Sequence, residues 1–364
     1  MAYGVVNADL MTTSDGVSSS GLYGFKNRLI NSAMVIDQRN AGASVTPIGS
    51  SGFAVDRWQY FTNATAGAFN AGQNLNSVTP PSGFTKYLGY QVASAQTPTG
   101  TNAYFFGQKI EGFNVADLGW GASGAQPISI SFWVRSSLTG THSGNLQNTS
   151  NARSYVFSYS INSANTWEYK TISVAGDTTG TWPTDNTTGL IIYFNLGCGT
   201  GIQTTAGSWN AAQYIGVTGG VSVVSNASAT WYITGVQLEK GSTATSFDYR
   251  PYGTELQLCQ RYLPAFNGVN SVIGSGAFFS ATVAWGIVKF PVTTRVAPTG
   301  LTASSGSAIT YYANGAYTTS AISLEIAGID GAQLRTTVSG APTGYASVAY
   351  LGTSGQLLFT GCEL

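Results

Sequence analysis

Charged residues are scarce in this chain. Asp, Glu, Lys and Arg make up 8% of its 364 residues, against about 25% in an average globular protein. Fifteen cations balance fifteen anions without any basic run, so the electrostatic footprint of a nucleic-acid-binding protein is missing. No stretch approaches the roughly 18 consecutive apolar residues of a membrane span. We therefore expect neither nucleic-acid binding nor membrane insertion.

Cysteine and histidine are nearly absent. Cys198, Cys259 and Cys362 include no C-x-x-C pair, which excludes a disulfide scaffold. We expect three small buried hydrophobes in a chain folded in a reducing cytoplasm. The single histidine, His142, lies in the segment 140–144, which reads as a loop tip without metal-ligating neighbours. We predict no metal site and no His-based catalytic triad.

Glycine, by contrast, is abundant. Its 46 residues are about one in eight, against a usual ~7%. Disorder does not explain this excess, because 43% of the chain is hydrophobic, 12% is aromatic and the net charge is zero. Short β-favouring runs separated by clusters of Gly, Ser, Thr and Asn are typical of a β-sandwich or barrel. The length predicts two or three domains.

Several runs predict individual strands. Residues 128–134 alternate apolar and polar side chains, which places Trp133 on the face opposite the aliphatic residues. Residues 155–161 alternate in the same way, and residues 231–238 form one more strand. Residues 190–194 are continuously apolar, as expected of a central strand that is covered on both sides.

Only residues 254–263 read as a helix. Thr254 is placed to cap it, Gln257 completes a capping box and Pro264 ends the run. We therefore predict an all-β chain in which a short helix separates two β domains. The expected divisions are an N-terminal arm, a β-sandwich, a helical connector and a small C-terminal β domain, at residues 1–25, 26–253, 254–264 and 265–364.

Two stretches of the sequence carry distinctive motifs. The first is N-R-L-I-N-S-A-M-V-I-D-Q-R at residues 27–39, followed by A-V-D-R-W at residues 54–58. The second is G-V-Q-L-E-K-G-S-T-A-T at residues 235–245, continuing to C-Q-R-Y at residues 259–262. Both stretches resemble a family of tailed-bacteriophage virion proteins that comprises tail fibres, head fibres and minor structural proteins. The first is similar to that family's opening N-x-L-I-N-G-x-F-x-I-x-Q-R and A-D-R-W.

The resemblance implies a jelly-roll sandwich like that of carbohydrate-binding modules, a C-terminal β module and a homotrimer. It also implies a place on the virion surface after assembly in the host cytoplasm. In agreement with assembly in the cytoplasm, the first residues lack the charged and apolar regions of a secretory signal. The arm shows little periodicity, and we expect it to order against other virion proteins of the tail or the capsid. Its candidate anchoring residues are Tyr3, Leu10, Leu22 and Phe25.

Some of the few charged residues belong to the resembling stretches. We expect Arg39, Asp56, Arg57 and Glu239 to form partly buried ion pairs that fix how the first strand meets the rest of the domain. Ligand binding is the alternative role. A structural calcium ion at Glu239 is a further alternative, but calcium needs six to eight oxygen ligands and the sequence offers one glutamate with scattered amides. We predict no cofactor.

Tryptophans are candidates for glycan binding, because aromatic faces stack on sugar rings while amides and hydroxyls bond to sugar hydroxyls. Trp120, Trp182 and Trp209 lie in loop-like surroundings, and Trp133 lies on a strand. Anchoring of loops to the core is the alternative role for the three loop tryptophans.

Catalysis finds little support in the sequence. Asp177 and Asp185 flank Trp182 and are the one acidic pair that glycoside hydrolysis could use, but both fit turn caps better. We predict a non-enzymatic, fibre-type virion structural protein that is displayed on the particle surface for attachment to host-surface polysaccharide. A capsid decoration protein that stabilises the head shell is the first alternative, and a polysaccharide depolymerase is the second.

Overall fold

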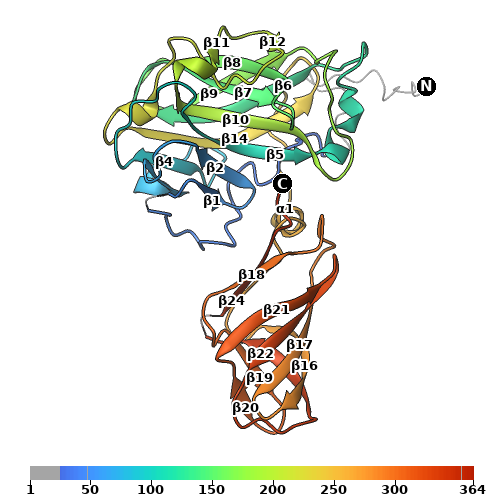
Figure 1. Ribbon diagram of the computed structural model, residues 1–364. Coiled ribbons are helices and arrows are strands. Elements are labelled where there is room, and N and C mark those ends of the chain that lie inside the picture. Colours follow the sequence, from blue (N-terminus) through green and yellow to red (C-terminus); the bar gives the residue numbers. More distant parts are fainter. Residues whose placement is uncertain (1–24, 47, 354) are drawn as a thin grey trace, which may run out of the picture. The chain divides into compact units, whose positions relative to one another are not determined.

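The computed structural model describes residues 25–46, 48–353 and 355–364, and the chain divides into two compact units between Arg250 and Pro251 (Figure 1). Apart from one α-helix and a few 3-10 turns, every regular element of these residues is a β-strand. The predicted all-β class is therefore confirmed. No helix within these ranges is long and apolar enough to cross a membrane. Three of the candidate anchoring residues lie outside the described residues, namely Tyr3, Leu10 and Leu22.

Two antiparallel sheets pack face to face in the first unit and form a jelly-roll β-sandwich (Figure 1). One sheet has seven strands in the order β1-β2-β5-β10-β7-β8-β12, and the other has five in the order β3-β4-β14-β6-β9. A short parallel pair, β11 with β13, accompanies them. The strands are β1 Ser51–Val55, β2 Trp58–Thr62, β3 Phe69–Gln73, β4 Leu88–Val92, β5 Ala103–Glu111, β6 Ile128–Ser136, β7 Gly140–Gln147, β8 Ser154–Ile161, β9 Glu168–Val174, β10 Thr188–Cys198, β11 Gln203–Thr204, β12 Trp209–Asn210, β13 Gly216–Val217 and β14 Thr230–Lys240.

The sandwich core follows the alternation within each strand. In β6 the apolar residues of the segment 128–134 are fully buried, while Trp133 lies on the opposite face, as predicted. Every residue of β10 is buried, which confirms the predicted central strand. Aromatic rings fill the middle, where Phe106 lies 5.3 Å from Phe194 and 4.9 Å from Trp231 between ring centroids. Burial of each such side chain contributes about 1.5–3 kcal/mol to folding.

His142 lies within β7 rather than at a loop tip, so this prediction is wrong. Its side chain is buried and stacks on the ring of Tyr159, with centroids 5.8 Å apart. The glycines on either side of His142 suggest a turn in the sequence, but Gly144 allows close packing within the sheet instead. A Cβ on Gly144 would lie 2.4 Å from both the Phe157 ring and the backbone oxygen of Tyr193. A glycine inside a strand often marks such a close approach.

The three cysteines, Cys198, Cys259 and Cys362, are buried and carry thiols rather than disulfides. Burial raises the pKa of the Cys198 and Cys362 thiols to about 11. These thiols stay protonated near neutral pH, so they act as the small hydrophobes that the sequence predicts.

The second unit begins with the helix α1, Tyr252–Gln260, which confirms the predicted helix. The predicted cap at Thr254 is wrong, because the helix begins at Tyr252 and Thr254 falls within its first turn. The carbonyl of Pro251 accepts a hydrogen bond from the N–H of Glu255 at 3.1 Å and so opens the helix. Proline suits the start of a helix, since it lacks the N–H that would have no partner there.

A seven-stranded sheet in the order β20-β19-β23-β16-β17-β22-β21 forms most of the second unit, beside a three-stranded sheet in the order β15-β24-β18. The edge strands β20 and β21 are separated by Thr319 and Ser320 alone. The Thr319 N–H donates to the backbone oxygen of Ile309, next to one edge of the sheet, and the Ser320 N–H donates to that of Thr337, next to the other edge. The two edges of the sheet therefore approach each other at this turn. The strands are β15 Ala265–Asn267, β16 Val272–Ser280, β17 Val283–Lys289, β18 Gly300–Ala303, β19 Ile309–Tyr312, β20 Ala316–Thr318, β21 Ala321–Ala327, β22 Gly331–Thr337, β23 Ala346–Leu351 and β24 Gln356–Thr360.

Candidate functional site

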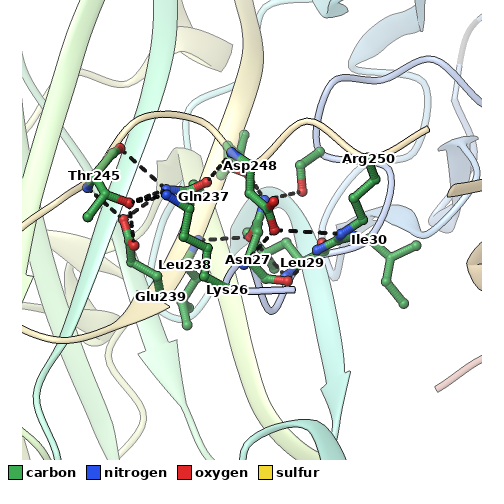
Figure 2. Close-up of polar contacts among 12 residues, drawn as sticks. Lys26, Asn27, Leu29, Ile30, Gln237, Leu238, Glu239, Thr245, Asp248 and Arg250 are labelled. Carbon is green, nitrogen blue, oxygen red and sulfur yellow. Dashed lines mark hydrogen bonds and ion pairs between the residues drawn. The ribbon is translucent and has the colours of Figure 1, made fainter. Parts of the chain in front are cut away.

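The two segments that carry the family resemblance meet in one hydrogen-bonded joint of the first unit (Figure 2). The buried amide of Asn27 donates to the backbone oxygen of Val236 at 2.9 Å and accepts from the N–H of Leu238 at 3.1 Å. Arg250 donates to the backbone oxygens of Leu29, at 3.1 Å, and of Asn27. The joint holds the segment that enters the sandwich against the segment that leaves it.

Glu239 belongs to the same joint. Its carboxylate accepts hydrogen bonds from the Gln237 amide at 2.8 Å, and from the backbone N–H and the hydroxyl of Thr245 at 2.8 and 2.7 Å (Figure 2). Its donors are therefore neutral groups close in sequence rather than an arginine. Phe25, the candidate anchoring residue that the structure describes, is exposed and lies 5.2 Å from the guanidinium of Arg250.

Asp56 and Arg57 lie at the turn between β1 and β2. Asp56 is buried and accepts from the backbone N–H of Gln38 at 3.1 Å and from the Gln38 amide at 2.6 Å. Arg57 has a positive φ of 70° and donates to a backbone oxygen of β5 at 2.6 Å. The guanidinium of Arg39 lies 4.5 Å from the ring centroid of Phe53. These contacts tie the entering segment to the seven-stranded sheet.

Three of the candidate tryptophans come together. The ring centroids of Trp120, Trp182 and Trp209 lie 4.8 to 5.5 Å apart, and each pair meets edge to face. Each indole N–H donates to a backbone oxygen at 2.7 to 3.1 Å, and all three side chains pack half-buried against the core. Such contacts suit the anchoring of loops. Trp133 lies apart from this cluster, on the outer face of the five-stranded sheet.

Asp177 and Asp185 are both engaged in structural contacts. Asp177 is buried and forms a bidentate ion pair with Arg153, at 2.7 and 2.6 Å. It also accepts from the N–H of Thr179 at 3.2 Å. Asp185 accepts from the hydroxyl and the N–H of Thr187, and these two bonds lower the pKa of its carboxyl. Both carboxylates act as turn caps.

A groove of about 670 Å³ lies on the outer face of the seven-stranded sheet. It crosses β1, β2, β5, β10 and β7, each of which contributes lining side chains. Five neighbouring strands span roughly 19 Å at the usual spacing of ~4.8 Å. In β5 the residues Ala103, Phe105 and Lys109 line the groove, whereas Phe106 between them belongs to the core.

Aromatic rings on three neighbouring strands line the groove, namely Phe61 of β2, Phe105 of β5 and Tyr193 of β10. Phe61 and Phe105 are paired in the strand register and stack with centroids 4.9 Å apart. The centroids of Phe105 and Tyr193 are 4.2 Å apart. Phe61 is 37% exposed, while the other two rings are largely buried beneath the groove and support it. The result is a continuous aromatic surface with one accessible ring.

Polar side chains border these rings. Gln59 and Gln213 line the groove, and no hydrogen bond joins either side chain to another described residue. Asn63 is already bonded to two backbone groups, and Asn151 accepts from Gln147, so these amides shape the wall. The groove therefore offers free amides next to an accessible ring.

Gly107 of β5 makes room for Tyr193. It is paired with Tyr193 of β10 and with Gln59 of β2 in the register. A Cβ at this position would lie 2.8 Å from the Tyr193 ring and 1.9 Å from the backbone oxygen of Ile192. The missing side chain lets the Tyr193 ring lie across β5 towards Phe105.

The sequence does not single out the groove residues. Phe61, Phe105 and Tyr193 stand in β-favouring runs where each reads as an ordinary strand residue. The apolar run around Tyr193 predicts a strand that is buried on both faces, so the sequence gives no sign of a groove there. The one available signal is Gly107 in the interior of a strand, because such a glycine indicates close approach of another group.

No protein-family model and no curated protein matches the sequence. Among solved structures, the chain is similar to the enzymatically active domain of tailspike protein 4 of bacteriophage CBA120, at 13% identity and a TM-score of 0.32, over 59% of this chain and 22% of that one. It is also similar to a CBM4 structure, at 14% identity and a TM-score of 0.29, over 58% and 98% of the two chains. A third similarity is to TmCBM61 in complex with β-1,4-galactotriose, at 9% identity and a TM-score of 0.30, over 60% and 100%. At these identities and TM-scores, no ligand or activity is transferred to this chain.

Proposed function

We propose that the first unit binds a glycan in the groove on its seven-stranded sheet. The observation that carries this proposal is the accessible Phe61 ring, supported by Phe105 and bordered by the Gln59 and Gln213 amides. Sugar rings offer C–H faces to aromatic side chains and hydroxyls to amides. The groove crosses several strands, which suits a linear chain of sugars. Lys109 is the only charged side chain among the described lining residues, which favours a neutral or anionic glycan over a cationic one.

An array of bacterial surface polysaccharides and linear oligosaccharides tests this proposal, followed by calorimetric titration of the strongest ligand. We expect Phe61→Ala to lower the affinity about tenfold, since a lost aromatic contact costs roughly 1 kcal/mol or more. Phe113→Ala is the matched control, because Phe113 is also exposed but does not line the groove. Full affinity in the Phe61→Ala variant would overturn the proposal.

We further propose that the chain is a fibre-type virion protein of a tailed bacteriophage that attaches to host-surface glycan. Support comes from the two resembling segments, which build a single joint around Asn27 and Arg250. Quantitative mass spectrometry of purified virions tests this assignment. A few copies per particle are expected for a fibre, while hundreds would favour the capsid decoration protein.

We propose a homotrimer, which the sequence resemblance implies. One face of the seven-stranded sheet in the second unit supports an assembly, because it exposes apolar side chains in one row of the register. Tyr312 is paired with Val348, and Ser275 is paired with both Val348 and Ile287. Such a face is suited to burial against another copy. Light scattering of the purified protein is expected to give the mass of three chains, and a monomer at micromolar concentration would overturn the proposal.

We propose that the protein does not cleave the glycan. Among the described residues, the acidic pair considered for hydrolysis is engaged in structural contacts, with Asp177 held by Arg153 and Asp185 by Thr187. Incubation with the bound polysaccharide is expected to release no reducing sugar. A measurable release that disappears in an Asp177→Asn or Asp185→Asn variant would establish the depolymerase instead.

A further inference from the structure

Trp133 and Tyr169 form an accessible aromatic pair on the outer face of the five-stranded sheet, away from the groove. The two residues are directly paired between β6 and β9, and their ring centroids lie 5.4 Å apart with planes inclined by 49°. Tyr169 is 45% exposed and Trp133 is partly exposed. Because β9 is the edge strand of its sheet, the pair lies where a ligand can approach.

The indole N–H distinguishes Trp133 from the clustered tryptophans. The N–H groups of Trp120, Trp182 and Trp209 all donate to backbone oxygens. Within the described part of the chain, no hydrogen bond occupies the Trp133 N–H, which also remains accessible. An unoccupied donor at the edge of an aromatic face is suited to a ligand that carries hydroxyl groups.

Hydroxyl side chains and one arginine surround the pair. Further along the same face of β9, Thr171 and Ser173 are exposed. Arg135, two residues after Trp133, is engaged elsewhere, since it donates to a backbone oxygen at 2.9 Å and lies over the ring of Tyr232 at 5.3 Å. An aromatic face among hydroxyls matches the two kinds of surface that a sugar ring presents.

We propose that Trp133 and Tyr169 form a second carbohydrate contact, which binds one sugar ring of a surface glycan independently of the groove. A glycan is favoured over a second copy of the chain, because two rings among hydroxyls offer far less than the roughly 800 Å² per partner of a stable interface. Contacts on the outer faces of two different sheets allow one unit to hold two glycan chains of a dense surface. Binding to such a surface then gains from avidity.

Fluorine NMR of protein labelled with 5-fluorotryptophan tests the contact directly. The Trp133 resonance is assigned with a Trp133→Phe variant, and the probes are methyl glucoside, methyl galactoside, methyl N-acetylglucosaminide and the polysaccharides of the array. We expect at least one probe to shift the Trp133 resonance, and the shift to persist in Phe61→Ala and to vanish in Tyr169→Ala. If no probe moves this resonance, the proposal is overturned.

Retention on an immobilised polysaccharide measures how much the second contact adds to avidity. We expect Trp133→Ala and Tyr169→Ala to lower apparent affinity for the surface on the order of a hundredfold, while the affinity of a short oligosaccharide for the groove stays the same. Phe113→Ala is again the control for loss of an exposed ring. Unchanged retention would overturn the second contact, whether or not the oligomeric mass changes. Failure of the groove proposal is recognised separately. That proposal is tested by the affinity of the Phe61→Ala variant, and its failure would not change the response of the Trp133 resonance.

Discussion

Asn27 accepts a hydrogen bond from the backbone N–H of Leu238, which lies 211 residues further along the chain, at 3.1 Å. The same buried side chain accepts from the N–H of Leu29 at 3.0 Å and donates to Ser32 and to the backbone oxygen of Val236. One amide thereby joins the segment that enters the sandwich to the strand β14. The motif around Asn27 therefore stabilises the fold by joining two segments that are distant in the sequence.

Replacement of Asn27 is expected to destabilise the first unit. Asn27→Ala removes four hydrogen bonds in a buried place, so we expect a loss of about 2–4 kcal/mol in the free energy of unfolding. Urea denaturation followed by tryptophan fluorescence provides the measurement. Asn226→Ala is the control, because Asn226 is exposed and donates to one backbone oxygen only. A loss of unfolding free energy no larger than that of the control would contradict the stabilising role of Asn27.

Gly107 is expected to position Tyr193 for glycan binding. In Gly107→Ala the added Cβ meets the Tyr193 ring and the backbone of β10, so we expect about 1–3 kcal/mol of destabilisation. The affinity for the glycan should fall about tenfold even where the variant is fully folded, because the floor beneath Phe61 shifts. Gly124→Ala is the control, since a Cβ at Gly124 has no atom within 4 Å. A folded Gly107→Ala protein that binds normally would show that the groove tolerates movement of Tyr193.

The ion pair between Arg153 and Asp177 is expected to hold the tryptophan cluster. Asp177 is buried, and the guanidinium of Arg153 lies 6.0 Å from the ring centroid of Trp209. Arg153→Ala leaves a buried carboxylate without its partner, so we expect a loss of about 3 kcal/mol and a changed tryptophan emission spectrum. Asp117→Asn tests an exposed ion pair, that with Arg28, and should cost less than about 1 kcal/mol. Equal effects of the two variants would refute the assignment.

Stability is expected to depend on pH through His142. Burial lowers the pKa of His142 below its usual 6.5, and Nδ1 has no hydrogen-bond partner among the described residues. Between the lowered pKa and 6.5 the unfolded chain binds more protons than the folded one, so stability falls as the pH falls through 6.5 and is unaffected above it. Melting temperatures from pH 8 to pH 5 should show this decline, and His142→Gln should flatten it. The same slope in both proteins would exclude His142 as the cause.

Local patterns in the sequence were sufficient for much of the fold. The alternation in residues 128–134 predicts β6 and the outward position of Trp133, because successive side chains of a strand point to opposite faces. The apolar run 190–194 predicts the central strand β10. The helix was predicted as well, but its start was misplaced at Thr254, since the sequence signal of a capping box is weaker than the turn set by Pro251.

The candidate site was beyond such reasoning, because its parts come from segments that pair only in the folded chain. Phe61 and Phe105 become neighbours through the pairing of β2 with β5, and Tyr193 joins them through β10. In the same way, Tyr169 becomes the partner of Trp133 only through the pairing of β6 with β9. No spacing along the chain encodes these pairs.

By itself, the sequence determined that this weakly charged, glycine-rich chain is all-β, with strands whose buried faces follow from alternation. The tertiary structure alone decided what its glycines and aromatic residues do. Gly144 and Gly107 stand at close approaches within sheets rather than at turns, and the aromatic side chains divide between the core, a loop cluster, a groove and an outer pair. The physical reason is that alternation is a property of one strand, whereas a surface is made by the order in which strands pair.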